Sequence, residues 1–499
     1  MTKRATTLTL WERLVRHGKV ASNAPTTPGA VQYPIIKLIP ICSTIEFRKA
    51  TGRVTMTTES SHVLYRNLRK PYTTIARGTG VTLWDNHGKE YLDAVGGVAV
   101  NVIGHGVPEI TDAIARAGAT TTFSYAAVFT NPWQEELASN IASISPIPDS
   151  KVFFTSGGSE ANESAIKLAR QYHLERGQPQ RWKVISRWQS YHGNTLGTLA
   201  ISGRPSWRIP YDPYLVASPH IVPPYCYRCP FEKTYPSCGV ECADDLERTI
   251  LQEGPDTISA FIAEPVVGTS LAGVVPVPEY YARIREICDR HGILFIADEV
   301  LTGYGRTGKA FSIDHWGIVP DIITVGKGVG SGYTPIAACI ADPKIVDVLR
   351  KGSGRFLHGF TYGGMSLACF IGVQVFEYIA RHDLFTRSAE QGTYLHEQLH
   401  AMALSRPAIG NVRGLGLFAG VELVADRDTK APFDKSLAVT DRIVAVAESK
   451  GLLLREGSPD ANYGKGGDQV QISPPYVITR DEIDRLVDLL GQSIDEVVG

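Results

Sequence analysis

Between Gly106 and about Gly330 the sequence alternates short apolar runs with segments of helical periodicity. The apolar runs lack the polar alternation of a half-exposed strand, so each is expected to be a strand covered on both faces. Such strands, alternating with helices, predict a mostly parallel sheet in an α/β fold. Ligands of these sheets bind beyond the carboxyl ends of the strands. The predicted strands are 151–155, 182–186, 257–263, 293–297 and 322–325.

The segments on either side of this alternation have a different pattern. Residues 81–93 predict two short strands around the turn Asn86-His87-Gly88. After Thr361, a helix at about 367–380 leads to a strand-like run at 416–424 and a closing helix at 479–490. Thr479 and Glu482 form a capping box at the start of that last helix. We expect four parts: a basic extension (1–60), a segment that joins a smaller α+β domain (61–105), a large domain (106–366) and a C-terminal small domain (367–499).

Composition excludes several partners. The 499 residues carry a net charge of −1, which favours neither nucleic acid nor an anionic membrane surface. No apolar run approaches the ~20 residues of a membrane span. Eight cysteines in a chain of this length do not make a secreted disulfide scaffold, so a reducing compartment is expected.

Residues 1–55 are basic, rich in Ser and Thr and poor in acids, as in a mitochondrial transit peptide. The alternative is an extended gene model with translation starting at Met56. The expected location is therefore the cytoplasm, with the mitochondrion as the alternative.

Three groups that could take part in catalysis or ligand binding lie next to the predicted strands. Lys327 follows the strand at 322–325 and opens a glycine-rich loop, where an amine can reach a carbonyl carbon. Asp298 ends an apolar strand, where a carboxylate needs a cationic partner. Residues 156–160, Ser-Gly-Gly-Ser-Glu, enter a helix whose N-terminus favours an anion. Amine, carboxylate and anion cradle together suit pyridoxal phosphate.

Each group also has an ordinary interpretation. Lys327 alone could be a solvated charge, although the strand before it and the glycines after it weaken that alternative. Asp298 could form a structural ion pair with Arg306. Gly158 and its neighbours could be a common helix N-terminus. Tyr191, just beyond a strand end, could lie on a cofactor ring or fill the core.

An ordered set of motifs makes residues 81–490 resemble the class III pyridoxal-phosphate aminotransferases, a family of fold type I. That fold has a large domain with a mostly parallel seven-stranded sheet and a smaller α+β domain. The matching motifs are Gly158-Ser159-Glu160-Ala-Asn-Glu, Tyr191-His192-Gly193, Glu264-Pro265-Val266, Asp298-Glu299-Val300 through Gly305-Arg306-Thr-Gly, Lys327, His358-Gly-Phe-Thr361-Tyr, Val412-Arg413-Gly-Leu-Gly-Leu and Pro474-Pro475.

The resemblance implies roles for these residues. Lys327 forms a Schiff base with the cofactor, and Asp298 pairs with its pyridine nitrogen. Arg413 receives a substrate carboxylate, for which a guanidinium is well suited, with a structural ion pair as the alternative. Thr361 reaches the phosphate of the partner subunit, so the enzyme is expected to be a homodimer. The implied cofactor-binding set is Gly158 and Ser159 at the phosphate, Tyr191 and Val300 on the two ring faces, His192, Glu264 near the ring hydroxyl, Asp298, Lys327 and Thr361.

Three positions bear on the substrate. Thr269 stands where ornithine- and acetylornithine-type members carry a glutamate that gates the arginine, and Leu301 replaces a glutamine near the ring hydroxyl. Both changes resemble the ω-transaminase side of the family. Ala99 lies in a segment that lacks the tryptophan common in those enzymes and resembles the acetylornithine type. The sequence therefore leaves the substrate open.

A proline- and tyrosine-rich insertion contains four cysteines spaced Cys226-x2-Cys229 and Cys238-x3-Cys242. The spacing would suit a four-thiolate zinc site. We favour the alternative of four reduced thiols, because the family needs no metal.

The expected function is transfer of an amino group from an amine or amino acid to an oxo acid, pyruvate or 2-oxoglutarate, by a ping-pong mechanism. Epimerases, aminomutases and decarboxylases of the same fold use nearly the same residues, so they remain alternatives. A non-catalytic scaffold is a remote third possibility, which the presence of Lys327, Asp298 and Thr361 opposes.

Overall fold

The structure, a computed structural model, describes residues 61–119, 122–459, 461–462 and 466–499. The chain divides into two compact units, Met1–Tyr72 and Thr73–Gly499, and the elements described below lie in the second. The expectations for residues 1–60, a transit peptide or an extended start, concern residues outside the described part of the chain.

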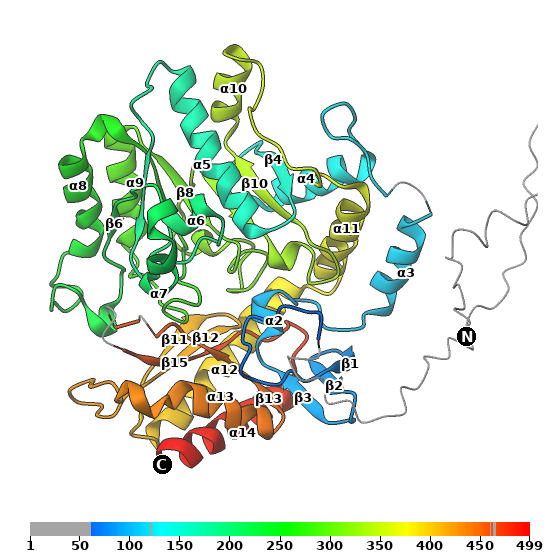
Figure 1. Ribbon diagram of the computed structural model, residues 1–499, viewed down its shortest axis with the longest axis vertical. Coiled ribbons are helices and arrows are strands. Elements are labelled where there is room, and N and C mark those ends of the chain that lie inside the picture. The colour runs from blue at the N-terminus through cyan, green and yellow to red at the C-terminus, as the bar shows by residue number, and fades with distance from the viewer. Residues whose placement is uncertain (1–60, 120–121, 460, 463–465) are drawn as a thin grey trace, which may run out of the picture. The chain divides into compact units, whose positions relative to one another are not determined.

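A seven-stranded sheet forms the centre of the second unit (Figure 1). Its strand order is β4-β10-β9-β8-β7-β5-β6, and β10 alone runs against its neighbours. This confirms the predicted α/β fold with a mostly parallel sheet. The strands are β4 (Lys151–Thr155), β5 (Lys183–Arg187), β6 (His220–Ile221), β7 (Ile258–Ala263), β8 (Leu294–Asp298), β9 (Ile322–Val325) and β10 (Ala337–Ala341).

Both faces of this sheet are covered, as continuous apolar strands require. On β8, Leu294 and Ile296 join an apolar cluster with Leu168 of α5 (Gly158–Glu175). Phe295 and Ala297 point the other way, into the main core. The other helices of this part are α3 (Pro108–Ala117), α4 (Pro132–Ile144), α6 (Leu196–Ala200), α7 (Pro205–Arg208), α8 (Glu241–Glu253), α9 (Tyr280–His291) and α10 (Pro343–Lys351).

The predicted hairpin at 81–93 is confirmed by the antiparallel pairing of β2 (Thr82–Asp85) with β3 (Glu90–Asp93). β1 (Ile75–Thr79) extends it on one side. On the other side β3 pairs in parallel with β13 (Leu452–Leu453), which comes from the C-terminal part of the chain. The N-terminal segment therefore shares a sheet with the C-terminal region.

A third sheet is antiparallel, with the order β11-β12-β15-β14. In Figure 1 it lies with α12, α13 and α14 in the lower half of the view. The capping box of Thr479 and Glu482 is present at the start of α14. The elements are β11 (Ile409–Leu415), β12 (Phe418–Leu423), β14 (Arg455–Glu456), β15 (Asp468–Ile472), α11 (Ser366–Arg381), α12 (Leu384–Leu404), α13 (Val439–Ser449) and α14 (Arg480–Val498). The proposed boundary at 366/367 stays a prediction, because 73–499 forms one compact unit.

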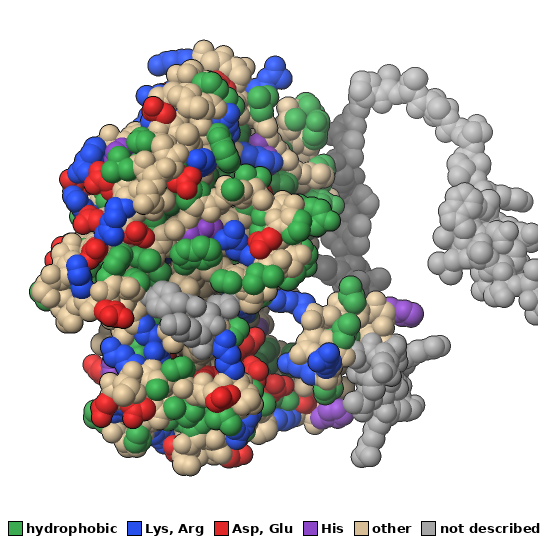
Figure 2. Space-filling model, turned by 60° about the vertical axis from the view of Figure 1, so that its left-hand side comes forward, with side chains coloured by type: hydrophobic (Ala, Val, Ile, Leu, Met, Phe, Trp, Pro, Cys, Tyr) green, Lys and Arg blue, Asp and Glu red, His purple; other side chains and the backbone are tan. Residues whose placement is uncertain are grey.

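Over the part of the chain that the structure describes, every helix is too short or too polar to cross a membrane. On the face shown in Figure 2, acidic and basic side chains are interspersed, in keeping with the near-zero net charge.

Candidate active site

The carboxyl ends of two adjacent parallel strands bring the predicted amine and carboxylate to one edge of the sheet. Asp298 is the last residue of β8 and pairs in register with Thr324 of β9. Lys327 follows β9 after one residue, Gly326. A methyl group on Gly326 would lie 3.4 Å from Val300 Cγ1 and 3.7 Å from the Gly158 nitrogen. The lysine loop, the segment after Asp298 and the start of α5 therefore meet at one place.

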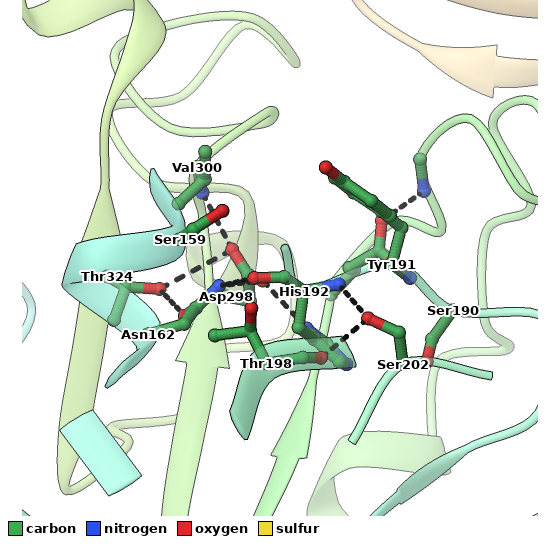
Figure 3. A network of polar contacts seen from close by, with 12 residues as sticks. Ser159, Asn162, Ser190, Tyr191, His192, Thr198, Ser202, Asp298, Val300 and Thr324 are labelled. Atoms are coloured by element: carbon green, nitrogen blue, oxygen red, sulfur yellow. Dashed lines mark hydrogen bonds and ion pairs between the residues drawn. The ribbon is translucent and has the colours of Figure 1, made fainter. Parts of the chain in front are cut away.

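Asp298 is buried and held by uncharged donors and one histidine (Figure 3). Its Oδ2 accepts from Asn162 Nδ2 at 2.8 Å and lies 2.7 Å from His192 Nδ1. Its Oδ1 accepts from the Val300 nitrogen at 3.1 Å and, more weakly, from Thr324 Oγ1 at 3.4 Å. These contacts orient the carboxylate, and its partners in the described part of the chain include no arginine or lysine.

The alternative of an Asp298–Arg306 ion pair is therefore wrong. Arg306 donates to the carbonyl oxygens of Leu417 at 3.1 Å and Pro474 at 2.5 Å instead. A buried carboxylate without a permanent cation is costly unless a ligand brings the positive charge. A protonated pyridine nitrogen is such a ligand.

Two residues of this network, Asn162 and Thr324, escaped prediction from the sequence. Asn162 lies in the first turns of α5 and also donates to the His192 carbonyl oxygen at 2.7 Å. Thr324 donates to Asn162 Oδ1 at 2.7 Å. The available signal was two polar side chains, one at a helix start and one in an otherwise apolar strand, both buried.

Lys327 has the environment of a nucleophilic amine. Removal from water lowers the pKa of Lys327 to about 8, Asp298 opposes that shift, and the charge of Arg455 reinforces it. Its ammonium makes no hydrogen bond to a described residue. Lys327 also has φ 44°, a left-handed conformation that costs a non-glycine residue ~1–2 kcal/mol. Such strain is concentrated at functional sites, where it fixes a side chain's direction.

The start of α5 forms the predicted anion cradle. The first amides of a helix have no intrahelical partner, and the helix dipole favours negative charge there. Gly158 is required by packing, because a methyl group on it would lie 2.5 Å from Val300 Cγ1. Ser159 Oγ accepts from the Asn194 nitrogen at 3.2 Å, which ties the loop after Gly193 to the cradle.

Tyr191 and Glu264 lie side by side at the same edge. The Tyr191 nitrogen donates to Glu264 Oε1 at 3.0 Å, and the Gly268 nitrogen donates to Oε2 at 2.7 Å. Burial raises the pKa of Glu264, while the neighbouring His192 opposes that shift. The Tyr191 ring meets the edge of Trp207 at a centroid distance of 5.7 Å. A half-buried aromatic ring next to a buried carboxyl suits a flat, polar-edged ligand.

Two predicted site residues, Thr361 and Arg413, lack the contacts within the described part of the chain that their expected roles would require. Thr361 is exposed, on the loop that precedes α11. Arg413, on β11, is in a 2.7 Å ion pair with Glu422 of β12, and all of its guanidinium nitrogens donate to protein acceptors. The ion-pair alternative for Arg413 is thus what the structure contains.

The four cysteines of the insertion, Cys226, Cys229, Cys238 and Cys242, line one small cavity and form no disulfide. Burial raises the pKa of the Cys242 thiol to about 12 and also raises that of Cys226, which favours protonated thiols. Across the described ranges, groups of three or more His, Cys, Asp and Glu side chains arranged to hold a metal ion are not found. The preference for reduced thiols over zinc stays a prediction.

These residues fit pyridoxal phosphate. The buried Asp298 has no arginine or lysine partner among the described residues, a charge that a pyridinium would supply, and the helix start at Gly158, which packs against Val300, has backbone amides suited to a phosphate. Buried His192 Nε2 has no partner in the described part of the chain, so the Asp298–His192 pair has capacity for one more polar contact. Lys327 brings an amine of lowered pKa to the same edge.

Comparisons with known proteins agree with this fit. The family model "Aminotransferase class-III" matches residues 64–494. The Bacillus subtilis aminotransferase YodT, itself uncharacterized, is 37% identical over 438 residues, covering 88% of this chain and 98% of the relative. The putrescine–pyruvate aminotransferase of Pseudomonas aeruginosa is 35% identical over 426 residues, covering 85% and 90%.

A solved structure shows the same fold. An (S)-enantioselective ω-transaminase from Thermomicrobium roseum superposes with a TM-score of 0.83 at 34% identity, covering 89% of this chain and 98% of the other. The family match spans both the seven-stranded sheet and the C-terminal antiparallel sheet. This chain therefore belongs to the class III aminotransferase family, whose members depend on pyridoxal phosphate.

Proposed function

We propose that this enzyme moves an amino group from an amine or amino acid to an oxo acid, pyruvate or 2-oxoglutarate, by a ping-pong mechanism through a Schiff base on Lys327. The proposal rests on one observation: two groups that lack a matching partner lie at the same edge of the sheet. Among the described residues, Lys327 is an amine without a hydrogen-bond partner, and Asp298 is a buried carboxylate without an arginine or lysine partner. One cofactor would supply both partners, an aldehyde for the Lys327 amine and a protonated ring nitrogen for the Asp298 carboxylate.

Pyridoxal phosphate, when bound, supplies an aldehyde for the amine and a ring that withdraws electrons. Asp298 would hold the ring nitrogen in its protonated form, and Asn162 and His192 hold Asp298 in place. The α5 amides would bind the phosphate. Tyr191 and Val300 would confine the ring. Each of these tasks is binding or orientation, which fixes the reacting carbon relative to Lys327.

Lys327 then acts as the proton carrier. A pKa of about 8 leaves a useful fraction of the amine neutral near pH 7.5, so it can remove a proton from the substrate carbon as a general base. The resulting ammonium returns a proton as a general acid. The amino donor and the oxo-acid acceptor bind at the same site in turn, so one set of residues serves both half-reactions.

A homodimer would complete the phosphate site. Thr361 lies on an exposed loop beside Tyr362, a residue that is 60% exposed and whose ring lies 6.3 Å, centroid to centroid, from that of Phe123. Phe129, from the segment that follows Phe123, is also 62% exposed. Large apolar side chains gathered on the surface typify a protein–protein interface. A second copy on this face would bury them and bring its Thr361 to the cofactor phosphate.

Two arginines are candidates for a substrate carboxylate. Arg413 was expected from the sequence, but its guanidinium is engaged by Glu422 and by backbone carbonyls. Arg455, on β14, lies close enough to Lys327 to lower its pKa. A guanidinium near the reacting amine can bind a carboxylate through two parallel hydrogen bonds. The charge at the reacting centre therefore supports Arg455.

The names of the relatives support a donor with a primary amine at the end of a carbon chain. One acts on putrescine with pyruvate, and another, from Halomonas elongata, is a diaminobutyrate–2-oxoglutarate transaminase with 35% identity over 435 residues. Thr269 and Leu301 point in the same direction, toward the ω-transaminase side of the family.

The test is a screen of amino donors against the purified, cofactor-loaded enzyme. We expect a donor to bleach the visible absorbance of the lysine-bound cofactor and an oxo acid to restore it. Turnover without any oxo acid would instead identify an epimerase, aminomutase or decarboxylase. Absence of the visible band would favour the scaffold alternative. Lys327→Ala should abolish turnover, and full activity in that variant would overturn the assignment.

A further inference from the structure

The cysteine-rich insertion after β6 contacts the antiparallel sheet through a buried charge cluster. Glu422 on β12 is fully buried, and its Oε1 accepts from Arg228 Nε at 2.6 Å. Its Oε2 accepts from Arg413 Nη1 at 2.7 Å and from the Tyr225 hydroxyl. Tyr225 and Arg228 belong to the insertion and Arg413 to β11, so three side chains from two segments converge on the carboxylate of Glu422. We call Arg228, Glu422 and Arg413 the Arg–Glu–Arg cluster.

Stability alone is a weak reason for such a cluster. Burying an ion pair costs most of what the attraction returns, and apolar side chains of similar size often do as well. What a buried ion pair does provide is a fixed geometry, because an unpaired charge there would be strongly unfavourable. The cluster is therefore expected to fix the position of a neighbouring segment.

That segment is the hairpin of residues 264–274, because Arg413 donates its remaining N–H groups to the tip of this hairpin. Its Nη2 and Nε donate to the Leu271 carbonyl oxygen at 2.8 and 3.1 Å, and Nε also reaches Ala272 O at 3.2 Å. Ala272 has φ 43° and Gly273 φ 80°, so the tip is a tight left-handed turn. A methyl group on Gly420 of β12 would meet the Ala272 oxygen at 1.8 Å. The tip lies flush against the strand that carries Glu422.

The base of the same hairpin is part of the cofactor site. Glu264 begins it, contacts the Tyr191 backbone, and accepts from the Gly268 nitrogen at 2.7 Å. The Val267 nitrogen bonds to Val274 O at 2.9 Å, which closes the two arms. Residues 264–274 therefore connect the cofactor edge to the Arg–Glu–Arg cluster. A shift of the tip would act on the Glu264 carboxylate through its contact with the Gly268 nitrogen.

We propose that Arg413 is a positioning residue, and that the Arg–Glu–Arg cluster, locked by Tyr225 of the insertion, fixes the 264–274 hairpin against the cofactor. This inference rests on the proposed function for what the hairpin positions. It assigns a task to the insertion, whose Arg228 binds Oε1 of Glu422 and whose Tyr225 binds Oε2 beside Arg413. It also replaces the expected role of Arg413 as a carboxylate receptor.

The direct test is amide hydrogen exchange of the hairpin in the cofactor-loaded, full-length enzyme. In Glu422→Gln, peptides covering 264–274 should exchange about tenfold faster, because the cluster loses its only carboxylate and Arg413 loses its anchor. The matched control is Arg283→Met. It removes a 2.7 Å ion pair with Asp244 on the outer face of α9 and should leave the hairpin unchanged. Tyr225→Phe, which deletes a single hydroxyl, carries the test if Glu422→Gln does not fold, with an acceleration of about threefold.

A second readout separates positioning from general loosening. The charge of Glu264 acts on Lys327, so a displaced hairpin should shift the pH midpoint of the visible absorbance of the lysine-bound cofactor in Glu422→Gln, by about half a unit, but not in Arg283→Met. Hairpin exchange within twofold of wild type in the folded variant, or equal acceleration in the control, would overturn the inference. Loss of the visible band in wild type would instead refute the proposed function, so the two failures are distinguishable.

Discussion

Replacing Lys327 by methionine should make the cofactor-free protein more stable near neutral pH. The side chain's pKa falls from 10.5 to about 8 on folding, because the protein around it excludes water. At ~1.4 kcal/mol per unit, that shift sets an upper bound of ~3.5 kcal/mol on the cost of keeping the amine charged. Part of the side chain reaches solvent, so we expect ~1–2 kcal/mol and a rise of ~1–3 °C in the unfolding midpoint.

The pH dependence identifies the cause. Between pH 8 and 10.5 the unfolded chain binds more protons at this site than the folded one, so wild-type stability rises with pH in that window. The advantage of Lys327→Met should therefore be largest below pH 8 and shrink by pH 10. Any benefit from apolar packing of the methionine side chain would be independent of pH. Thermal unfolding of the cofactor-free protein at pH 7 and pH 10 measures both.

Lys183 provides the control, since its ammonium is also partly buried but pairs with Glu253 at 2.8 Å. Lys183→Met should lower the midpoint at pH 7, opposite in sign to Lys327→Met. If Lys327→Met lowers the midpoint at pH 7, or gives the same difference at both pH values, the burial argument for Lys327 is refuted.

Three further changes test the site. Gly158→Ala should weaken cofactor affinity about tenfold or more in a fluorescence titration, because the methyl group meets Val300 at 2.5 Å; unchanged affinity would place the phosphate elsewhere. Asn162→Ala removes a 2.8 Å donor from Asp298 and should raise the rate of cofactor loss several-fold, whereas an unaltered rate would make that contact dispensable. Arg455→Gln should raise KM about tenfold for substrates with a carboxylate and leave carboxylate-free amines unaffected; an equal effect on both would exclude it as the receptor.

The sequence was sufficient for five of the seven strands of the main sheet, all except β6 and β10, because those five are largely apolar runs. β4 and β9 were predicted to the residue, and β8 to within one, because an apolar run without polar alternation leaves no competing pattern. β10 was not predicted. Its sequence, Ala-Ala-Cys-Ile-Ala, has low strand propensity, and its place between β4 and β9 is set by pairing on both sides.

The site was predictable where a residue's task is local. Lys327, Asp298 and Gly158 sit at strand ends or a helix start, and the structure brings them to one edge. Asn162 and Thr324 were missed because their task depends on a neighbour distant in sequence, Asp298. Sequence position alone gives no sign of that contact.

Arg413 was found from its motif, but the sequence does not show the partners of its guanidinium. The motif around it is strong, but its partner Glu422 comes from the next strand and its other partners are backbone carbonyls and side-chain amides. A motif identifies a conspicuous arginine without showing where its guanidinium points. Only the paired strands β11 and β12 reveal that the charge is already matched.

The central claim is that Lys327 carries the cofactor. Reduction of the cofactor-loaded enzyme with borohydride fixes any Schiff base as a stable amine, and peptide mass spectrometry then locates it. We predict that the added cofactor mass appears on the peptide containing Lys327 and disappears in Lys327→Ala. Modification of a different lysine, or no modified peptide from an enzyme that shows the visible band, would contradict the account.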